Sequence, residues 1–284
     1  MKNAYRIDGS ERIRLKDYKA DDTRGITRED GEREAQALGE ELVELQELLY
    51  AASDHSVLIV LQGRDTSGKD GTIRFLTSPL SASGCDVASF KVPKGEELTH
   101  DFLWRIHKQT PARGEMRIFN RSHYEDVLVV RVHNLAPEVV WKKRYEHINN
   151  FENMLVDAGT IILKFYLHID AEEQENRLHK REQDATKFWK LSVGDWEERE
   201  HWDAYTEAYE AVINKCSSPH APWYVVPANK KWYRNLIIAR SIAEQLRPLK
   251  KEWLRVLEIR GEQELLRIQQ FQSQHKANAK SGKS

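Results

Sequence analysis

Residues 63–72 have the composition of a phosphate-binding loop. They read GRDTSGKDGT, so Gly63 and Gly68 enclose four residues and Lys69 follows directly. Glycines let the backbone bend until successive N–H groups point inward, and the lysine ammonium can reach phosphoryl oxygens. An apolar strand before the loop and a helix after it complete the arrangement that a phosphate cradle needs. The pattern predicts that phosphates bind to Gly63, Thr66, Ser67, Gly68, Lys69, Asp70, Gly71 and Thr72.

Two acidic residues in this loop depart from the usual pattern. Asp70 follows the lysine, where a Ser or Thr hydroxyl normally ligates Mg²⁺, and Thr72 offers a hydroxyl two positions later. Asp65 places a carboxylate where phosphates should lie. That charge would repel phosphates unless Mg²⁺ lies between them, or unless the carboxylate orients or deprotonates an attacking phosphate oxygen. A loop-stabilising Asx turn is the simpler alternative for Asp65.

A second polar segment, residues 120–132, follows a short predicted strand and reads NRSHYEDVLVVRV. In P-loop enzymes a carboxylate at such a strand end normally holds Mg²⁺. Asn120 occupies that position here, so the nearest carboxylates are Glu125 and Asp126. We therefore predict that Asp126 binds the metal together with Asp65. A solvated first turn of a helix is the simpler alternative for the two carboxylates of this segment.

The same segment contains arginines that suit phosphate binding. Arg121 and Arg131 can clamp phosphates with planar, bidentate guanidinium groups. His123 could accept a phosphoryl group, but a packing or hydrogen-bonding role is more common for such a histidine. The catalytic residues predicted from the two segments are Asp65, Lys69, Arg121 and Asp126.

A basic segment later in the chain has the character of a mobile lid. Residues 172–190 read EEQENRLHKREQDATKFWK and follow a strongly apolar strand, where lids lie in nucleotide kinases. Basic lid residues neutralise transferring phosphates and exclude water when the lid closes. An ordinary charged helix is the alternative. The predicted lid covers residues 171–195, and its predicted phosphate-binding residues are Arg177, Arg181 and Lys187.

Strands and helices are predicted to alternate along most of the chain. Such alternation implies βαβ units, right-handed crossovers and a parallel sheet. The predicted strands are residues 56–62, 86–91, 115–120, 160–169 and 223–227. The predicted helices are residues 27–50, from 70 onward, 96–109, 137–158, 171–184, 195–215 and 229–247.

Three parts of the chain follow from this pattern. Residues 1–26 are polar and form a predicted irregular N-terminal extension. Residues 27–248 form the predicted phosphotransferase domain, because Pro248 marks the end of its last helix. Residues 249–284 form a charged helical tail, whose end, KANAKSGKS, is predicted to be disordered.

Composition excludes several classes of protein. The chain has 284 residues, of which 40% are hydrophobic and 31% charged, and its net charge is −1. The charge balance argues against a nucleic-acid-coating protein, and no apolar run approaches the roughly 20 residues of a membrane span. Cys85 and Cys216 are the only cysteines, which excludes a disulfide scaffold. We therefore expect a cytoplasmic protein that binds neither nucleic acid nor membranes.

Four segments together resemble polyphosphate kinase family 2. They are GRDTSGKDGTI, FKVPKGEELTHDFLWRIH, IFNRSHYEDVLVVRV and APWYVVPANKKWYRN, in the family's order, and the resemblance runs from about residue 28 to 247. It implies a P-loop kinase fold similar to thymidylate kinases, with a parallel sheet sandwiched by helices and a helical lid. It also implies Mg²⁺-dependent transfer of phosphate between inorganic polyphosphate and nucleotides, with Mn²⁺ as an alternative cation.

The resemblance carries roles to particular residues. Asp65 and Lys69 match the family's loop carboxylate and phosphate lysine, and Arg121 matches its strand-end arginine. Many members have Asp where this chain has Asn120. The NRSHYED form resembles the class III subgroup, which accepts both AMP and ADP, so the carboxylates of the turn would have to serve there. Arg177 and Arg181 fall in the family's lid, and the predicted nucleotide-binding residues are Asn120, Arg121 and Glu125.

The expected activity is reversible phosphate transfer from polyphosphate to AMP and ADP, which gives ADP and ATP. Guanine nucleotides are a further acceptor class, and the expected assembly is a homo-oligomer. Two alternatives remain at the level of sequence. One is a nucleoside or nucleotide kinase that uses ATP. The other is a non-catalytic module that senses nucleotides or phosphate.

Overall fold

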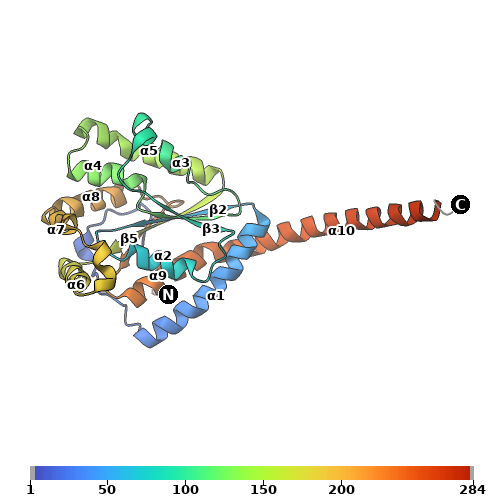
Figure 1. Cartoon of the computed structure of the whole chain (residues 1–284), viewed down its shortest axis with the longest axis horizontal. Coiled ribbons are helices and arrows are strands. Elements are labelled where there is room, and N and C mark those ends of the chain that lie inside the picture. The colour runs from blue at the N-terminus through green and yellow to red at the C-terminus, as the bar shows by residue number, and fades with distance from the viewer. Residues whose placement is uncertain (1–3, 282–284) are drawn as a thin grey trace.

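A six-stranded sheet forms the centre of the structure, a computed structural model that describes residues 4–281, with side chains described up to residue 274. The strands lie in the order β1-β6-β5-β2-β4-β3 (Figure 1). Five of them are parallel and β1 alone is antiparallel, paired with β6 at one edge. The strands are β1 Tyr5–Ile7, β2 Ser56–Gln62, β3 Cys85–Ser89, β4 Met116–Asn120, β5 Thr160–His168 and β6 Trp223–Pro227.

The central strand β2 is apolar because helices cover both faces of the sheet. All seven of its residues are buried. Val57, Ile59 and Leu61 face a core formed with α1, α9 and the start of α10, whereas Leu58 and Val60 face a core formed with α5 and α8. A parallel sheet buried on both faces requires such continuous apolar strands, so the predicted parallel architecture is confirmed.

Ten α-helices surround the described sheet. They are α1 Arg28–Ala52, α2 Lys69–Thr77, α3 Trp104–His107, α4 Val129–Val132, α5 Glu138–Asp157, α6 Ala171–Glu182, α7 Val193–Glu200, α8 Trp202–Lys215, α9 Lys231–Leu246 and α10 Lys250–Ser281. Short 3₁₀ helices lie at Leu15–Asp17, Gly95–Thr99, His123–Val127, Ala185–Lys190 and Arg247–Leu249.

The first long helix begins where its capping residues predict. The Thr27 side chain accepts a hydrogen bond from the Asp30 N–H and so satisfies one free donor of the first turn of α1. The apolar stripe of α1 includes Leu38, Leu42 and Leu45, which are buried against α9. Packing of this stripe, rather than helix propensity, holds the 25-residue helix in place.

Two predicted helices are interrupted in the structure. In the segment 96–109, Asp101 Oδ1 accepts a hydrogen bond from the Leu103 N–H, 2.9 Å away, and His100 is extended, so only a 3₁₀ turn and the short α3 form. Local side-chain hydrogen bonds of this type compete with the helix. The segment predicted as one helix from Asp195 forms α7 and α8, which meet at His201.

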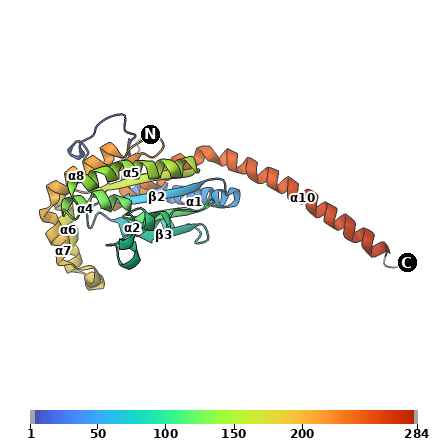
Figure 2. The same ribbon diagram turned by 90° about the horizontal axis from the view of Figure 1, so that it is seen from above.

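The last helix, α10, extends away from the domain (Figures 1 and 2). Its first turns pack on α1 through the fully buried Trp253, and Arg260 still reaches the Ala51 carbonyl at 3.2 Å. Of the predicted disordered end, residues 282–284 lie outside the described residues, and α10 includes those up to Ser281. None of the helices of the described chain combines the length and the apolar character of a membrane span.

Candidate active site

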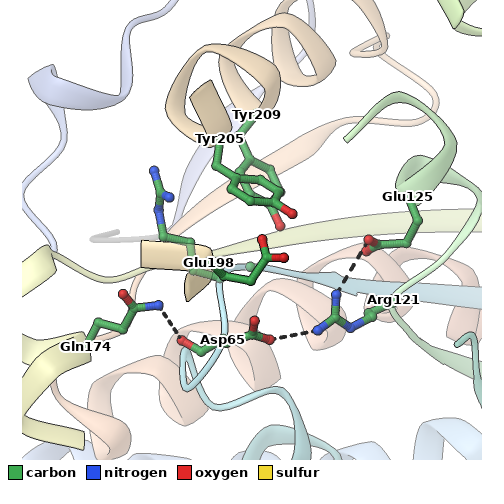
Figure 3. Close-up of a pocket in the computed structure, with 9 residues that line it drawn as sticks. Asp65, Arg121, Glu125, Gln174, Glu198, Tyr205 and Tyr209 are labelled. Carbon is green, nitrogen blue, oxygen red and sulfur yellow. Dashed lines mark hydrogen bonds and ion pairs between the residues drawn. The ribbon is translucent and has the colours of Figure 1, made fainter. Parts of the chain in front are cut away.

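The phosphate loop, residues 63–72, and the second polar segment, residues 120–132, meet at the carboxyl ends of the parallel strands. Gly63 follows β2 and Arg121 follows β4, and these strands are parallel neighbours, so their ends lie together. A polar pocket opens there, between the loop and the helices α6 to α8 (Figure 3). Its lining consists of Gly63, Arg64, Asp65, Arg121, Glu125, Gln174, Glu198, Tyr205 and Tyr209.

Glycine is required at two positions of the loop. Gly68 has a φ of 107°, and a Cβ atom there would lie 1.9 Å from Nη1 of Arg234. Gly63 has a φ of 153°, and its Cβ atom would lie 2.6 Å from Oγ of Ser67. Any other residue at Gly68 would therefore clash and adopt a strained backbone. The backbone of the predicted phosphate loop thus has the tight curvature that its glycines imply.

Lys69 lies at the start of α2 with its side chain folded under the loop. Its ammonium donates hydrogen bonds to the carbonyls of Gly63, at 2.6 Å, and Arg64, at 3.1 Å. Burial and the nearby Arg121 charge lower the pKa of Lys69 to about 8, although the Asp65 carboxylate acts in the opposite direction. An arriving phosphate would offset both effects, because an anion favours the charged ammonium.

Three loop hydroxyls have no hydrogen-bond partner among the described residues. The hydroxyl oxygens of Thr66, Ser67 and Thr72 are all buried. A buried polar group without a partner costs free energy, and water, an ion or a ligand can supply that partner. The hydroxyls therefore fit a loop that binds phosphate oxygens or the water shell of a cation.

Arg121 joins the loop to the turn that follows β4. Its Nη2 donates to Oδ1 of Asp65 at 2.7 Å, and its Nη1 lies 3.5 Å from a carboxylate oxygen of Glu125 (Figure 3). Burial alone would lower the pKa of Arg121, but the Glu125 and Asp65 carboxylates raise it above its ordinary value. Arg121 also has a φ of 62°, a left-handed conformation that is uncommon for non-glycine residues and is found often at active sites. The structure therefore brings together three of the predicted site residues.

Asp126 does not join this group. Its carboxylate accepts a hydrogen bond from Nη1 of Arg144 at 2.8 Å, and it does not line the pocket. Burial raises the pKa of Asp126 to about 6, although the charges of Arg144 and Arg105 act against that shift. The carboxylate of this turn that lies near Asp65 is that of Glu125.

Two other predicted residues of the β4 side also lie away from the pocket lining. Arg131 is 3.5 Å from the Glu207 carboxylate and stacks over the Trp141 ring. Asn120 donates to Oδ1 of Asp70 at 3.2 Å, so it bridges the end of β4 to α2. Their predicted roles in phosphate and nucleotide binding stay predictions.

The predicted lid cations have protein partners in this arrangement. Arg177 is buried and donates to the Thr66 and Ser67 carbonyls at 2.9 and 3.0 Å, so it braces the loop from behind. Arg181 pairs with Asp195 at 2.7 Å, and Lys187 pairs with Asp184. Arg181 and Lys187 would have to exchange these carboxylates for phosphate when a substrate binds.

Several residues that line the pocket belong to no sequence motif that predicts a site. Tyr205 and Tyr209 have the spacing of an ordinary buried helix face, yet α8 directs both rings into the pocket (Figure 3). Arg64 anchors α8 to the loop: it donates to the Trp202 carbonyl at 2.7 Å and stacks 3.6 Å from the centre of the Trp202 ring. Only the fold brings α8, about 140 residues further along the chain, to the loop.

A buried polar network fixes the turn that carries Glu125. The Tyr124 hydroxyl donates to Oε1 of Glu152 at 2.7 Å, and His123 lies 3.2 Å from the same oxygen. The Lys164 ammonium, from β5, contacts the Glu152 carboxylate and also donates to the Cys216 carbonyl. His123 is therefore a packing and hydrogen-bonding residue in this structure, the alternative that the sequence favoured.

Replacing Glu152 by glutamine should destabilise the protein at neutral pH by about 2 kcal/mol, because it removes the carboxylate partner of the buried Lys164. Burial would raise the pKa of Glu152, but Lys164 and His123 hold it below its ordinary value. The stabilisation is thus present above the unfolded pKa and is lost as the pH falls through the lower, folded value. Urea unfolding of both proteins should show a gap that narrows in acid. A gap that does not change with pH would contradict the paired carboxylate.

The carboxylates of the pocket suit a cation held partly by substrate. Among the described residues, one triad is close enough to ligate a metal by itself: Asp54, His55 and Glu252. Asp54 and His55 directly precede β2, whereas the loop follows it, so this triad lies at the opposite end of the strand. Mg²⁺ commonly binds through one or two carboxylates, substrate phosphates and water. Asp65, with Glu125 beside Arg121 and the free loop hydroxyls, fits that mode of binding.

Comparison with known proteins identifies the family. The family model described as polyphosphate kinase 2 matches residues 25–253. An AMP/ADP-polyphosphate phosphotransferase of Meiothermus ruber is 51% identical over 253 residues, which cover 88% of this chain and 94% of that protein. An ADP-polyphosphate phosphotransferase of Rhodopseudomonas palustris is 44% identical over 243 residues, which cover 81% and 84%.

Solved structures show the same fold. The crystal structure of polyphosphate kinase 2 from Arthrobacter aurescens superposes with a TM-score of 0.81 at 39% sequence identity. The match covers 88% of this chain and 92% of that one. The P-loop kinase fold predicted from the sequence is therefore confirmed.

Proposed function

Since the chain belongs to the polyphosphate kinase 2 family, we propose that it transfers phosphate reversibly from inorganic polyphosphate to AMP and ADP. The observation that carries this proposal is the pocket in which the phosphate loop, Arg121 and the carboxylates of Asp65, Glu125 and Glu198 meet. The similarity to the relative named AMP/ADP-polyphosphate phosphotransferase supports both acceptors. Guanine nucleotides are a further acceptor class within the proposal.

The proposed roles follow from the contacts. Lys69 and the loop N–H groups hold the phosphoryl group in transit, because they surround the space inside the loop. Arg121 lies between Asp65 and Glu125, where it can neutralise charge on the oxygens between donor and acceptor. The pocket side, with Tyr205 and Tyr209, receives the acceptor nucleotide. Positioning and charge neutralisation are the main requirements of this chemistry.

Phosphotransferases of this family generally use a divalent cation, and we propose Mg²⁺ here, with Mn²⁺ as an alternative. Bound between Asp65 and the substrate phosphates, the cation would supply charge neutralisation. Asp65 keeps one carboxylate oxygen outside the Arg121 hydrogen bond for this purpose. Glu125 is the second proposed ligand group of the pocket.

Raising the ionic strength should raise the KM for long-chain polyphosphate several-fold between about 0.05 and 0.3 M salt, because charge dominates binding of a repeating anion and salt screens it. The KM for AMP should change less, since a base and a ribose also contribute to its binding. Initial rates at several salt concentrations test this. Equal salt effects on both substrates would contradict a charge-dominated donor site.

A time course that starts from AMP should show ADP first and then ATP. Separation of nucleotides at timed intervals, with polyphosphate in excess, measures this directly. If AMP gives ADP only and added ADP stays unchanged, the dual acceptor proposal is wrong. The polyphosphate proposal would survive that result.

We also propose a cytoplasmic homo-oligomer. The two cysteines are free thiols, which suits a reducing compartment. The outer part of α10 exposes Leu265, Ile268 and Phe271 to solvent, and a second copy of this helix is the proposed partner.

Truncation after Arg260 should convert the oligomer to a monomer and keep the domain folded, because the contacts with α1 lie before that point. Light scattering after size exclusion measures the mass, and a Tm close to that of the full chain is the control. An unchanged mass would place the subunit contacts elsewhere, for example on α1.

A further inference from the structure

A cluster of cations lies on the other side of the phosphate loop from the pocket. The pocket opens toward α8, which packs on one face of the sheet, whereas Lys231 and Arg234 belong to α9, which packs on the opposite face. Arg177 and Lys187 of the lid segment lie close enough that their charges, with burial, lower the pKa of Lys231. Glu173 is the acidic group that acts on Lys231 in the opposite direction. Glu173 pairs with Arg177 at 2.7 Å and Asp184 pairs with Lys187, so the cations of this cluster without a carboxylate partner among the described residues are Lys231 and Arg234.

Arg234 is the central residue of this cluster. It is 2% exposed, and its Nε and Nη2 donate to Oδ1 of the neighbouring Asn235, an uncharged group. Within the described chain its Nη1 has no hydrogen-bond acceptor. Burial and the Arg177 charge lower its pKa to about 10. A buried guanidinium beside a second one, with no carboxylate of its own, is costly unless an anion joins them.

The guanidinium is directed at the beginning of α2. A Cβ atom at Gly68 would lie 1.9 Å from Nη1 of Arg234, and one at Gly71 would lie 3.3 Å from Nη2. Because neither glycine carries a side chain, the guanidinium of Arg234 can pack against the first turn of α2. Gly68 is the N-cap of this nine-residue helix and offers no side chain to its free N–H groups. Guanidinium and helix N-terminus together form a site of positive potential.

We propose that Arg234 and Lys231 form a second anion subsite that binds internal phosphates of the polyphosphate donor. This rests on the proposed function, and it adds residues of α9 to the donor path. A repeating phosphate chain whose terminal group lies in the loop must leave the loop somewhere. The pocket side is the proposed place of the acceptor nucleotide, whereas the α9 side offers cations along the exit.

The test compares Lys231→Gln and Arg234→Gln with Lys250→Gln, a control that removes one positive charge from the start of α10. The KM for long-chain polyphosphate should rise about tenfold in Arg234→Gln and a few-fold in Lys231→Gln, as expected for lost charge-assisted contacts. The KM for AMP should stay within about twofold of wild type. With tripolyphosphate, which has only one internal phosphate, the differences from wild type should shrink.

Direct binding gives an independent measure. Long-chain polyphosphate should raise the Tm of the wild type and of Lys250→Gln more than that of either α9 variant, because a ligand stabilises the state that binds it. If Arg234→Gln fails to fold, the exposed Lys231 decides the question alone. An unchanged KM for every donor length, or an increase confined to the KM for AMP, would overturn the subsite. Absence of polyphosphate transfer by the wild type itself would instead refute the proposed function.

Discussion

Lys69→Ala is expected to lower kcat by about a thousandfold and to leave the protein folded. The ammonium folds back onto the loop, where it donates to two loop carbonyls. When phosphate replaces those carbonyls, the lysine neutralises charge that develops during transfer. Loss of such a contact is worth several kcal/mol in the transition state, and the residues that line the pocket include no lysine that could replace it.

The structural cost of this substitution should be small. Lys69 has a pKa lowered to about 8 because burial of its charge is unfavourable, so alanine removes a destabilising charge together with two hydrogen bonds. Lys190→Ala is a matched control, because it also removes a lysine that contacts α2. Lys190 pairs at 2.7 Å with Asp70, the residue that follows Lys69 on that helix. A folded Lys69→Ala protein with near-normal kcat would contradict the phosphate role of the loop.

Asp65→Asn is the second large effect that we expect. The rate at saturating substrate should fall about a hundredfold, and the Mg²⁺ concentration for half-maximal rate should rise tenfold or more. The carboxylate holds Arg121 and faces the space where cation and phosphates would meet. An asparagine keeps the size and one oxygen but loses the charge, so it isolates the electrostatic contribution.

Substitutions of Glu125 and Asp126 test which of these carboxylates binds the cation together with Asp65. Glu125→Gln should also raise the Mg²⁺ requirement, because Glu125 lines the pocket beside Arg121. Asp126→Asn should leave it within about twofold of wild type, because that carboxylate is engaged with Arg144. If Asp126→Asn shifts the Mg²⁺ titration and Glu125→Gln does not, the metal lies where the sequence alone predicted it.

The sequence predicts the loop and the sheet well because both have strong local signals. β2 is apolar throughout and is followed at once by the glycines and Lys69, so strand, loop and helix are evident without tertiary information. The edge strand β1 is different. It has three residues, and its pairing with β6 joins residues more than 200 positions apart, which no local pattern encodes.

The candidate site shows the same division. Asp65, Arg121 and Glu125 come from two motifs and meet in the structure, since parallel neighbouring strands end together, although the sequence pointed to Asp126 rather than Glu125 as the partner of Asp65. Asp126 follows Glu125 directly, but its carboxylate contacts Arg144 and does not line the pocket. The turn that sets this direction is fixed by the distant Glu152, which no local pattern reveals. No sequence pattern marks Arg234 as a buried residue, because an arginine near the start of a helix is normally interpreted as an exposed charge.

The most direct test of polyphosphate as donor uses purified enzyme, AMP, Mg²⁺ and long-chain polyphosphate, with no ATP present, followed by separation of the nucleotides. A parallel reaction contains ATP as the only donor, and Lys69→Ala purified in the same way controls for contaminating kinases. We predict that ADP and then ATP accumulate with polyphosphate, and that Lys69→Ala forms neither at a comparable rate. If the wild type forms no product from polyphosphate but phosphorylates AMP with ATP, the protein is an ATP-dependent nucleotide kinase and the proposed donor is wrong.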